Sequence, residues 1–172
     1  MPAVRAELTR LRALAEGALV QVDDRAFFHA DSPEENSLAV LVKHLAGNMR
    51  SRWTEFLTTD GEKPDRHRDS EFVIEETDTR AALMERWEHG WETLLGTIDA
   101  LGPGDLQRTV RIRGEPHTVL QALERQQSHY AYHVGQIVQL ARHLAGEGWK
   151  TLSIPRGGSA AFNRESGPYL AE

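Results

Sequence analysis

Apolar residues recur at intervals of three and four along four segments of the chain, the spacing of helices with one buried face. The predicted helices cover residues 4–29, residues from Ser37 to the TTDGEKP stretch, residues from Thr77 or Asp78 to the LGPGD stretch, and residues 118–144. Their apolar stripes include Leu8, Leu11, Ala15, Leu19, Val22, Leu38, Leu41, Leu45, Met49, Trp53, Phe56, Leu57, Leu83, Trp87, Trp91, Leu94 and Ile98. We therefore expect the tryptophans at 53, 87 and 91 in the core or at an interface.

The segments between these helices complete the predicted architecture. TVRIR alternates apolar and polar residues and precedes Gly114 and Pro116, so it could form a short strand or hairpin. Residues from about 147 to 172 are rich in Gly, Pro and Ser, and we expect an irregular C-terminal arm that folds over one end of the helices. The pattern predicts an all-α fold, a four-helix bundle with long connections that forms a single domain over residues 1–172.

Charge and composition narrow the classes of partner. The 172 residues carry a formal charge of −6 and no basic tract, so neither nucleic acid nor an anionic membrane surface is an expected partner. Charged residues interrupt the first twenty positions, and no apolar stretch is long enough for a membrane span, so we expect a cytoplasmic protein. The chain has no cysteine, so any thiol in its chemistry must come from a substrate or cofactor.

Two histidines stand four apart in the QQSHYAYHVGQ stretch of the last predicted helix. His129 and His133 share one helix face and could bind the same metal ion. His44 lies among apolar residues on the second predicted helix and is the best candidate for a third ligand. Three ligands with an open position are typical of a catalytic site, and imidazole ligation suits Zn, Ni, Fe or Cu. A hydrogen-bonded core role for these histidines stays open as an alternative.

Other polar residues lie near these histidines in the predicted helices. Asn48 follows His44 by one turn, while Gln126 and Gln136 flank the histidine pair, so these three could orient a ligand or line a pocket. Candidates for binding a substrate carboxylate are Arg52, Arg125 and Arg156. Among the other histidines, His67 and His89 are expected to be solvated, and His143 points to a different face of its helix. His117 could approach the mouth of the pocket, although a capping or surface role is favoured.

Several longer strings of the sequence resemble the DinB/YfiT-like superfamily of metal-dependent bundle proteins. They are VKHLAGNMRSRW, TTDGEKP, RDSEF, RQQSHYAYHVGQIV and LSIPRGGSAAFN, which together span roughly residues 36–163. The resemblance implies an up-down-down-up four-helix bundle, often a homodimer. It also implies a divalent metal, most commonly Zn or Ni, held at the positions of His44, His129 and His133.

The resemblance also implies the kinds of function to consider. Similar proteins include transferases and isomerases that use a low-molecular-weight thiol, which a metal ion would hold as the nucleophilic thiolate. Our leading hypothesis is therefore a metal-dependent enzyme for a small-molecule substrate, a thiol-dependent transferase or a hydrolase. The alternative is a non-catalytic metal-binding or dimerisation bundle in a stress response, because no general base stands beside the histidines: Tyr130 occupies the position where a zincin would have its Glu.

Overall fold

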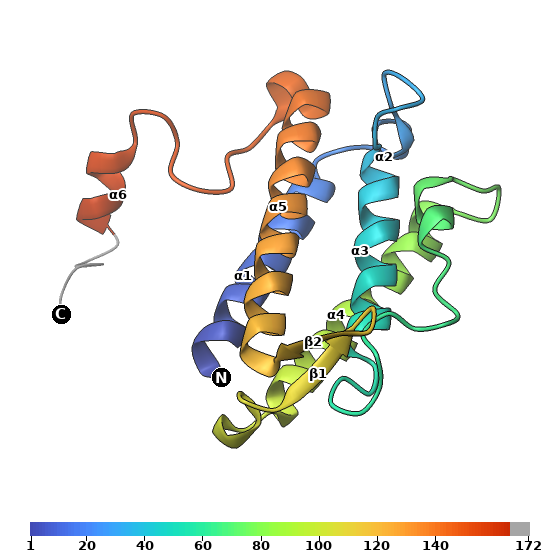
Figure 1. Cartoon of the computed structure of the whole chain (residues 1–172). Coiled ribbons are helices and arrows are strands. Elements are labelled where there is room, and N and C mark those ends of the chain that lie inside the picture. The colour runs from blue at the N-terminus through green and yellow to red at the C-terminus, as the bar shows by residue number, and fades with distance from the viewer. Residues whose placement is uncertain (166–172) are drawn as a thin grey trace.

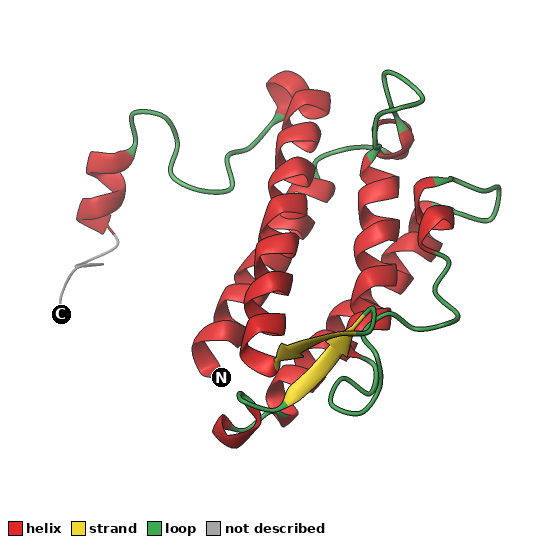
Figure 2. Cartoon of the chain, in the orientation of Figure 1, coloured by secondary structure: helices red, strands yellow, loops and turns green. Residues whose placement is uncertain are grey.

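The computed structural model describes residues 1–165, which are mostly helical, in agreement with the predicted all-α class (Figure 1). The long helices are α1 (Pro2–Leu19), α3 (Leu38–Trp53), α4 (Arg80–Ala100) and α5 (Val119–Ala145). The described residues also form two short α-helices, α2 (Asp24–Phe28) and α6 (Ser159–Glu165), and one hairpin of β1 (Thr109–Ile112) and β2 (Glu115–Thr118) (Figure 2). Three 3-10 helices complete them: Arg68–Phe72, Pro103–Asp105 and Gly146–Gly148. Within residues 1–165, no helix has both the length and the apolar character needed to cross a membrane.

The core lies between the four long helices. α3 packs along α4, and α1 packs along α5, while α3 and α5 also contact each other. Trp53, Trp87 and Trp91 are fully buried there, which confirms their predicted core positions. The contact between α3 and α5 matters for function because His44 lies on α3 and the two later histidines lie on α5.

The helix predicted over residues 4–29 is wrong beyond Leu19, where the chain turns and begins α2. The predicted face of α1 is buried, and the apolar stripe continues to the buried Val22, although this residue lies beyond the end of the helix. Asp23 then starts a new helix, because its side chain accepts a hydrogen bond from the backbone N–H of Ala26. The Asp23 cap was the sequence signal that distinguishes two helices from one.

The other helix boundaries follow the capping residues. Ser37 caps α3 as predicted, its hydroxyl accepting from the N–H of Val40. The cap of α4 is Thr79, not Thr77 or Asp78. Asp78 is instead buried and accepts a hydrogen bond from Lys43 on α3 at 2.6 Å. The residue that the sequence offered as a helix cap therefore forms a tertiary ion pair.

The second predicted helix ends earlier than its apolar spacing suggests. α3 ends at Trp53, and Glu55 adopts a positive φ of 48° that a continuing helix does not allow. Phe56 and Leu57 therefore lie outside the helix, although Phe56 remains buried against Trp53 with ring centroids 4.7 Å apart.

The predicted hairpin is present between α4 and α5. β1 and β2 pair antiparallel, and Thr118 at the end of β2 forms a capping box with Gln121 at the start of α5. The Asp60 carboxylate accepts from the N–H groups of Arg113 and Gly114 in the hairpin turn. This contact ties the loop after α3 to the hairpin and fixes the position of Arg113 near the site described below.

The C-terminal arm differs from the prediction in two respects. It contains a helix, α6, and its later part extends away from the other helices instead of folding over their end (Figure 1). Among the described residues of the arm, the first ones pack on the long helices, where the backbone of Lys150 exchanges hydrogen bonds with the Gln21 side chain of the turn after α1. Residues 166–172 of the arm lie outside the described residues.

Candidate metal centre

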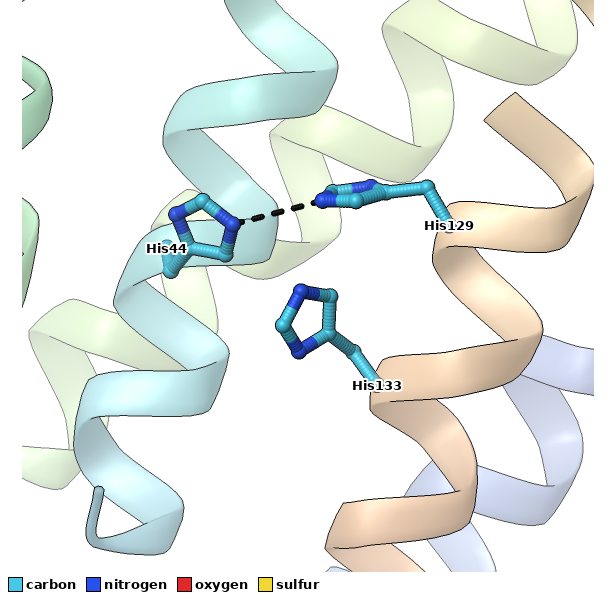
Figure 3. A group of neighbouring side chains, drawn as sticks. All are labelled: His44, His129 and His133. Atoms are coloured by element: carbon cyan, nitrogen blue, oxygen red, sulfur yellow. Dashed lines mark hydrogen bonds between the residues drawn. The ribbon is translucent and has the colours of Figure 1, made fainter. Parts of the chain in front are cut away.

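Three histidines that are far apart in the sequence meet between α3 and α5. One nitrogen of each ring points toward the space between the rings of His44, His129 and His133 (Figure 3). The three nitrogen atoms lie within 4.8 Å of one another, and Nε2 of His44 is 3.4 Å from Nε2 of His129. Among the described residues, these histidines form the group of side chains that could hold a metal ion.

The spacing of the nitrogens matches the requirements of a metal ion. In a tetrahedral zinc site with Zn–N bonds of about 2.0–2.1 Å, ligand nitrogens are about 3.3–3.4 Å apart. The His44–His129 pair already has this separation. The third ring, His133, offers a nitrogen within 4.8 Å of the other two, so its side chain would have to move closer where that distance exceeds the ideal one.

His44 is held by a carboxylate behind it. Nδ1 of His44 donates to Oε2 of Glu71 at 2.8 Å, and both side chains are buried. Arg66 donates two hydrogen bonds, of 2.8 and 2.9 Å, to the same carboxylate. Burial by itself would raise the pKa of Glu71, but the hydrogen bonds from His44 and Arg66 outweigh it and keep this pKa below the ordinary value. The carboxylate is therefore ionised and orients the His44 ring.

The two α5 histidines have different surroundings. Nδ1 of His133 donates to Oε1 of Gln136 one turn later, at 2.7 Å, as the spacing of these residues predicts. Nδ1 of His129 is buried and has no hydrogen-bond partner. Burial, with the neighbouring His133 and His44 rings, lowers the pKa of His129 from 6.5 to about 3, and burial also lowers the pKa of His133. Both rings are therefore neutral near pH 7, the form that binds metals.

The hydrogen-bond partners assign the proton positions in the cluster. Because Nδ1 of His44 and Nδ1 of His133 donate, each ring keeps a lone pair on Nε2. His129 has two possible neutral tautomers. If its proton is on Nε2, His129 donates to His44, and the buried Nδ1 of His129 keeps an unsatisfied lone pair. If its proton is on Nδ1, the Nε2 lone pairs of His129 and His44 face each other at 3.4 Å. A bound cation removes the second conflict, so the donor set fits a metal ion.

A cavity of about 360 Å³ opens on one side of the histidines. Asn48 and Gln126 line it, as the sequence suggested, and both side chains are buried. Gln126 keeps its Oε1 without a hydrogen-bond partner. The lining residues are His44, Asn48, Arg52, Arg66, Arg68, Phe72, Arg113, Arg125, Gln126, His129, Tyr132 and His133.

A buried hydrogen-bond chain supports the floor of this cavity. Nε1 of Trp53 donates to the hydroxyl of Tyr130 at 2.8 Å, and that hydroxyl donates to Oδ1 of Asn48 at 3.1 Å. The chain crosses from α3 to α5 at the level of the histidines and holds the Asn48 amide in place. Tyr130 thus has a structural role, at the position where a zincin motif would place its general base.

The structure places some of the remaining arginines and histidines at the cavity and others away from it. Arg52 and Arg125 line the cavity, whereas Arg156 is an exposed residue of the C-terminal arm. His67, His89 and His143 are exposed, as expected. His117 lies 3.4 Å from Arg125 and is not part of the histidine cluster.

Sequence reasoning missed Glu71 and Arg66, which support His44 from the loop between α3 and α4. Glu71 sits in a short 3-10 helix, Arg68–Phe72, within a loop that shows no periodicity. The only signal was that RDSEF is one of the strings that carried the family resemblance. Neither its partner nor its burial could be derived from the sequence.

Comparison of the chain with curated proteins and with solved structures gave no match. A family model does match, over residues 1–158, and its description is "Protein of unknown function (DUF1572)". The matched range contains all three clustered histidines, Glu71 and every residue that lines the cavity. The chain therefore belongs to the DUF1572 family.

Proposed function

We propose that this protein is a metal-dependent enzyme that acts on a small molecule, with His44, His129 and His133 as the ligands of a divalent ion. The observation that carries the proposal is the convergence of three imidazole nitrogens, within 4.8 Å of one another, on the wall of a cavity. Three protein ligands leave an open coordination position, which distinguishes catalytic from closed structural sites. The volume of about 360 Å³ suits a small substrate.

The ligand chemistry favours Zn or Ni, and is also compatible with Fe or Cu. When bound, such an ion would act as a Lewis acid and lower the pKa of a water or of the thiol of a small cofactor. A thiol-dependent transferase or a hydrolase is the corresponding reaction class. The chain has no cysteine, so a thiol would be supplied by a low-molecular-weight molecule.

The protein's own residues would position the reactants. Glu71 and Gln136 fix the orientation of His44 and His133 through their Nδ1 atoms. Asn48 and Gln126 present amide groups to the cavity, and the free Oε1 of Gln126 can accept a hydrogen bond from a substrate. Buried polar groups of this kind position a substrate by its hydrogen-bonding groups.

We assign the fold to the DinB/YfiT-like superfamily with its up-down-down-up bundle. In support, α1 begins near the hairpin that precedes α5, and α4 ends near the same hairpin, while α3 begins at the opposite end (Figure 1). We also propose a homodimer, as the family resemblance implies; Phe162 of the C-terminal arm and Tyr132 of α5 are exposed aromatic residues that a partner could cover. Light scattering that gives the mass of a monomer would contradict the dimer.

A non-catalytic metal-binding or dimerisation protein is the second candidate. It is favoured by one observation: among the described residues, the cavity lining contains no carboxylate, serine or cysteine that could act as a general base or nucleophile. A site whose open position exchanges with small thiols or hydroxide supports the enzyme. A fourth protein ligand in the metal-loaded protein supports the structural role.

Metal analysis of the purified protein tests the proposal. We expect about one divalent ion per chain in the wild type and less than about a tenth of this in a His129→Ala, His133→Ala double variant. His143→Ala is the matched control, because this exposed histidine also lies on α5 but outside the cluster. Full metal occupancy in the double variant would refute the assignment of the ligands.

A further inference from the structure

The cavity beside the histidines is strongly basic, although the whole chain is acidic with a formal charge of −6. Five arginines line it, and no Asp or Glu does so among the described residues. The arginines come from α3, the loop after it, the hairpin turn and α5; they are Arg52, Arg66, Arg68, Arg113 and Arg125. Such a concentration of guanidinium groups in an acidic protein requires a local explanation.

The carboxylates around the cavity do not neutralise these arginines. Arg66 is fully engaged, because it binds both Glu71 and Glu62. Glu62 is also the acidic partner of Arg113 at 3.5 Å and of Arg52 at 3.9 Å, so three arginines share one carboxylate. The cavity wall therefore carries excess positive charge.

Arg125 lies outside this network. The contact of its side chain in the structure is with His117, 3.4 Å from its Nη1 atom. A histidine does not neutralise a guanidinium group, so no carboxylate among the contacts of the described residues offsets the positive charge of Arg125 at the cavity wall.

Arg52 is the most informative of the five. It is 4% exposed, and its Nε and Nη1 atoms are buried without a hydrogen-bond partner. Its ion pair with Glu62, at 3.9 Å, is too long for a hydrogen bond. A buried charge with unsatisfied hydrogen-bond donors is unfavourable, and an anion in the cavity would supply a counter-charge close to it. A buried guanidinium group whose carboxylate partner is distant and shared therefore points to a ligand of negative charge.

The helices place this charge at a defined distance from the histidines. Arg52 follows His44 by eight residues on α3, about 12 Å along the helix and on a similar face. Arg125 precedes His129 by four residues on α5, about 6 Å along the helix. The arginine end and the histidine end of the cavity are thus one to two helical turns apart.

We infer that the small molecule bound in this cavity carries an anionic group, a carboxylate or a phosphate, which Arg52, Arg113 and Arg125 bind beside the three histidines. The inference rests on the proposed function for the reacting group at the histidine end and adds the chemical class of the substrate. Arginine suits this role because its planar fork binds carboxylate and phosphate oxygens with two parallel hydrogen bonds.

Three small thiols of different charge provide a direct test with the cobalt-loaded protein, in which thiolate binding produces a charge-transfer absorption. The probes are 3-mercaptopropionate, neutral 2-mercaptoethanol and cationic cysteamine. We expect wild type to bind 3-mercaptopropionate at least about tenfold more tightly than the other two, because charge-assisted hydrogen bonds to arginine are strong. Equal affinity for the three thiols would overturn the inference.

Arginine variants separate this effect from chelation of the metal by the carboxylate. In Arg125→Gln and Arg52→Gln we expect the preference for 3-mercaptopropionate to fall at least about fivefold, with unchanged cobalt content and unchanged affinity for 2-mercaptoethanol. Arg125 is exposed, so its variant retains the fold even if Arg52→Gln is unstable. Arg142→Gln is the control, since Arg142 is an exposed α5 residue that does not line the cavity. An unchanged preference in Arg125→Gln and Arg52→Gln would also overturn the inference.

If the protein binds no cobalt, that result refutes the proposed metal-dependent function but not the binding of an anion. A second measurement then tests anion binding by itself. Metal-free protein is then melted with inorganic phosphate or acetate, against chloride of equal ionic strength. Binding of either anion raises the Tm of the wild type, and Arg125→Gln reduces that rise. The larger effect identifies phosphate or carboxylate as the preferred group. Equal Tm values in phosphate, acetate and chloride would refute anion binding.

Discussion

Oε2 of Glu71 lies 2.8 Å from Nδ1 of His44, on the side of the ring opposite the histidine cluster. The other oxygen of the same carboxylate binds Arg66. One loop residue therefore fixes the tautomer of the α3 histidine and keeps its Nε2 lone pair directed at α5. The orientation of the His44 ring thus depends on a residue outside the histidine cluster.

Glu71→Gln should weaken metal binding while the protein stays folded. The amide can still accept the proton of His44 but has no negative charge, so we expect metal affinity to fall about 10- to 100-fold. Competition with a chromophoric chelator measures this. Glu76→Gln makes the same charge change at an exposed position of the same loop and should leave the affinity unchanged. Equal affinities in the two variants would show that Glu71 only supports the loop.

Gly47→Ala should disturb the same contact from α3. A Cβ atom on Gly47 would overlap Oε1 of Glu71 and lie 2.9 Å from its Cδ, so the carboxylate must move away from His44. We expect a loss of metal affinity of about tenfold or more, with the gain in helix propensity cancelled by the clash. Gly96→Ala is the control, because an added Cβ there meets no atom within 4 Å and should stabilise α4 by up to about 1 kcal/mol.

Tyr130→Phe should lower stability more than metal affinity. Removing the hydroxyl leaves Nε1 of Trp53 and Oδ1 of Asn48 without partners in the core, which costs about 2 kcal/mol. Urea unfolding of the metal-free protein measures the change. Tyr132→Phe removes a hydroxyl from a 64% exposed ring and should change stability by less than about 0.5 kcal/mol. Equal losses in the two variants would contradict a structural role for the Tyr130 hydroxyl.

Asp78→Asn should destabilise the protein at neutral pH and weaken its response to acid. Burial alone would raise the pKa of Asp78, but hydrogen bonds from Lys43 and the backbone of Glu75 keep it below 3.8. The unfolded chain therefore takes up this proton first, so the stabilisation is present above about pH 3.8 and is lost as pH falls toward the native pKa.

The expected loss for Asp78→Asn at pH 7 is about 3 kcal/mol, because Lys43 would remain buried without its counter-charge. Below about pH 3.8 the stabilities of the variant and the wild type should converge. Asp99→Asn breaks the exposed ion pair with Arg5 and should cost less than about 1 kcal/mol. Urea unfolding between pH 2.5 and 7 gives both curves, and parallel curves for wild type and Asp78→Asn would contradict this account.

The sequence alone determined the features that depend on local periodicity. The four-residue spacing of His129 and His133 placed both rings on one face of α5, and the spacing from His133 to Gln136 anticipated their hydrogen bond. Ser37 was recognised as the cap of α3 from residue type alone. In contrast, the break after Leu19 was missed, because the apolar spacing continues to Val22 while the backbone turns.

Only the tertiary structure decided what stands opposite those rings. His44 joins the pair because α3 packs against α5, and Glu71 reaches His44 because the loop after α3 folds back on that helix. Arg113 reaches the cavity because Asp60 holds the hairpin turn. Helical periodicity specifies which face of a helix is buried, whereas contacts between distant segments depend on how helices pack and on the paths of aperiodic loops.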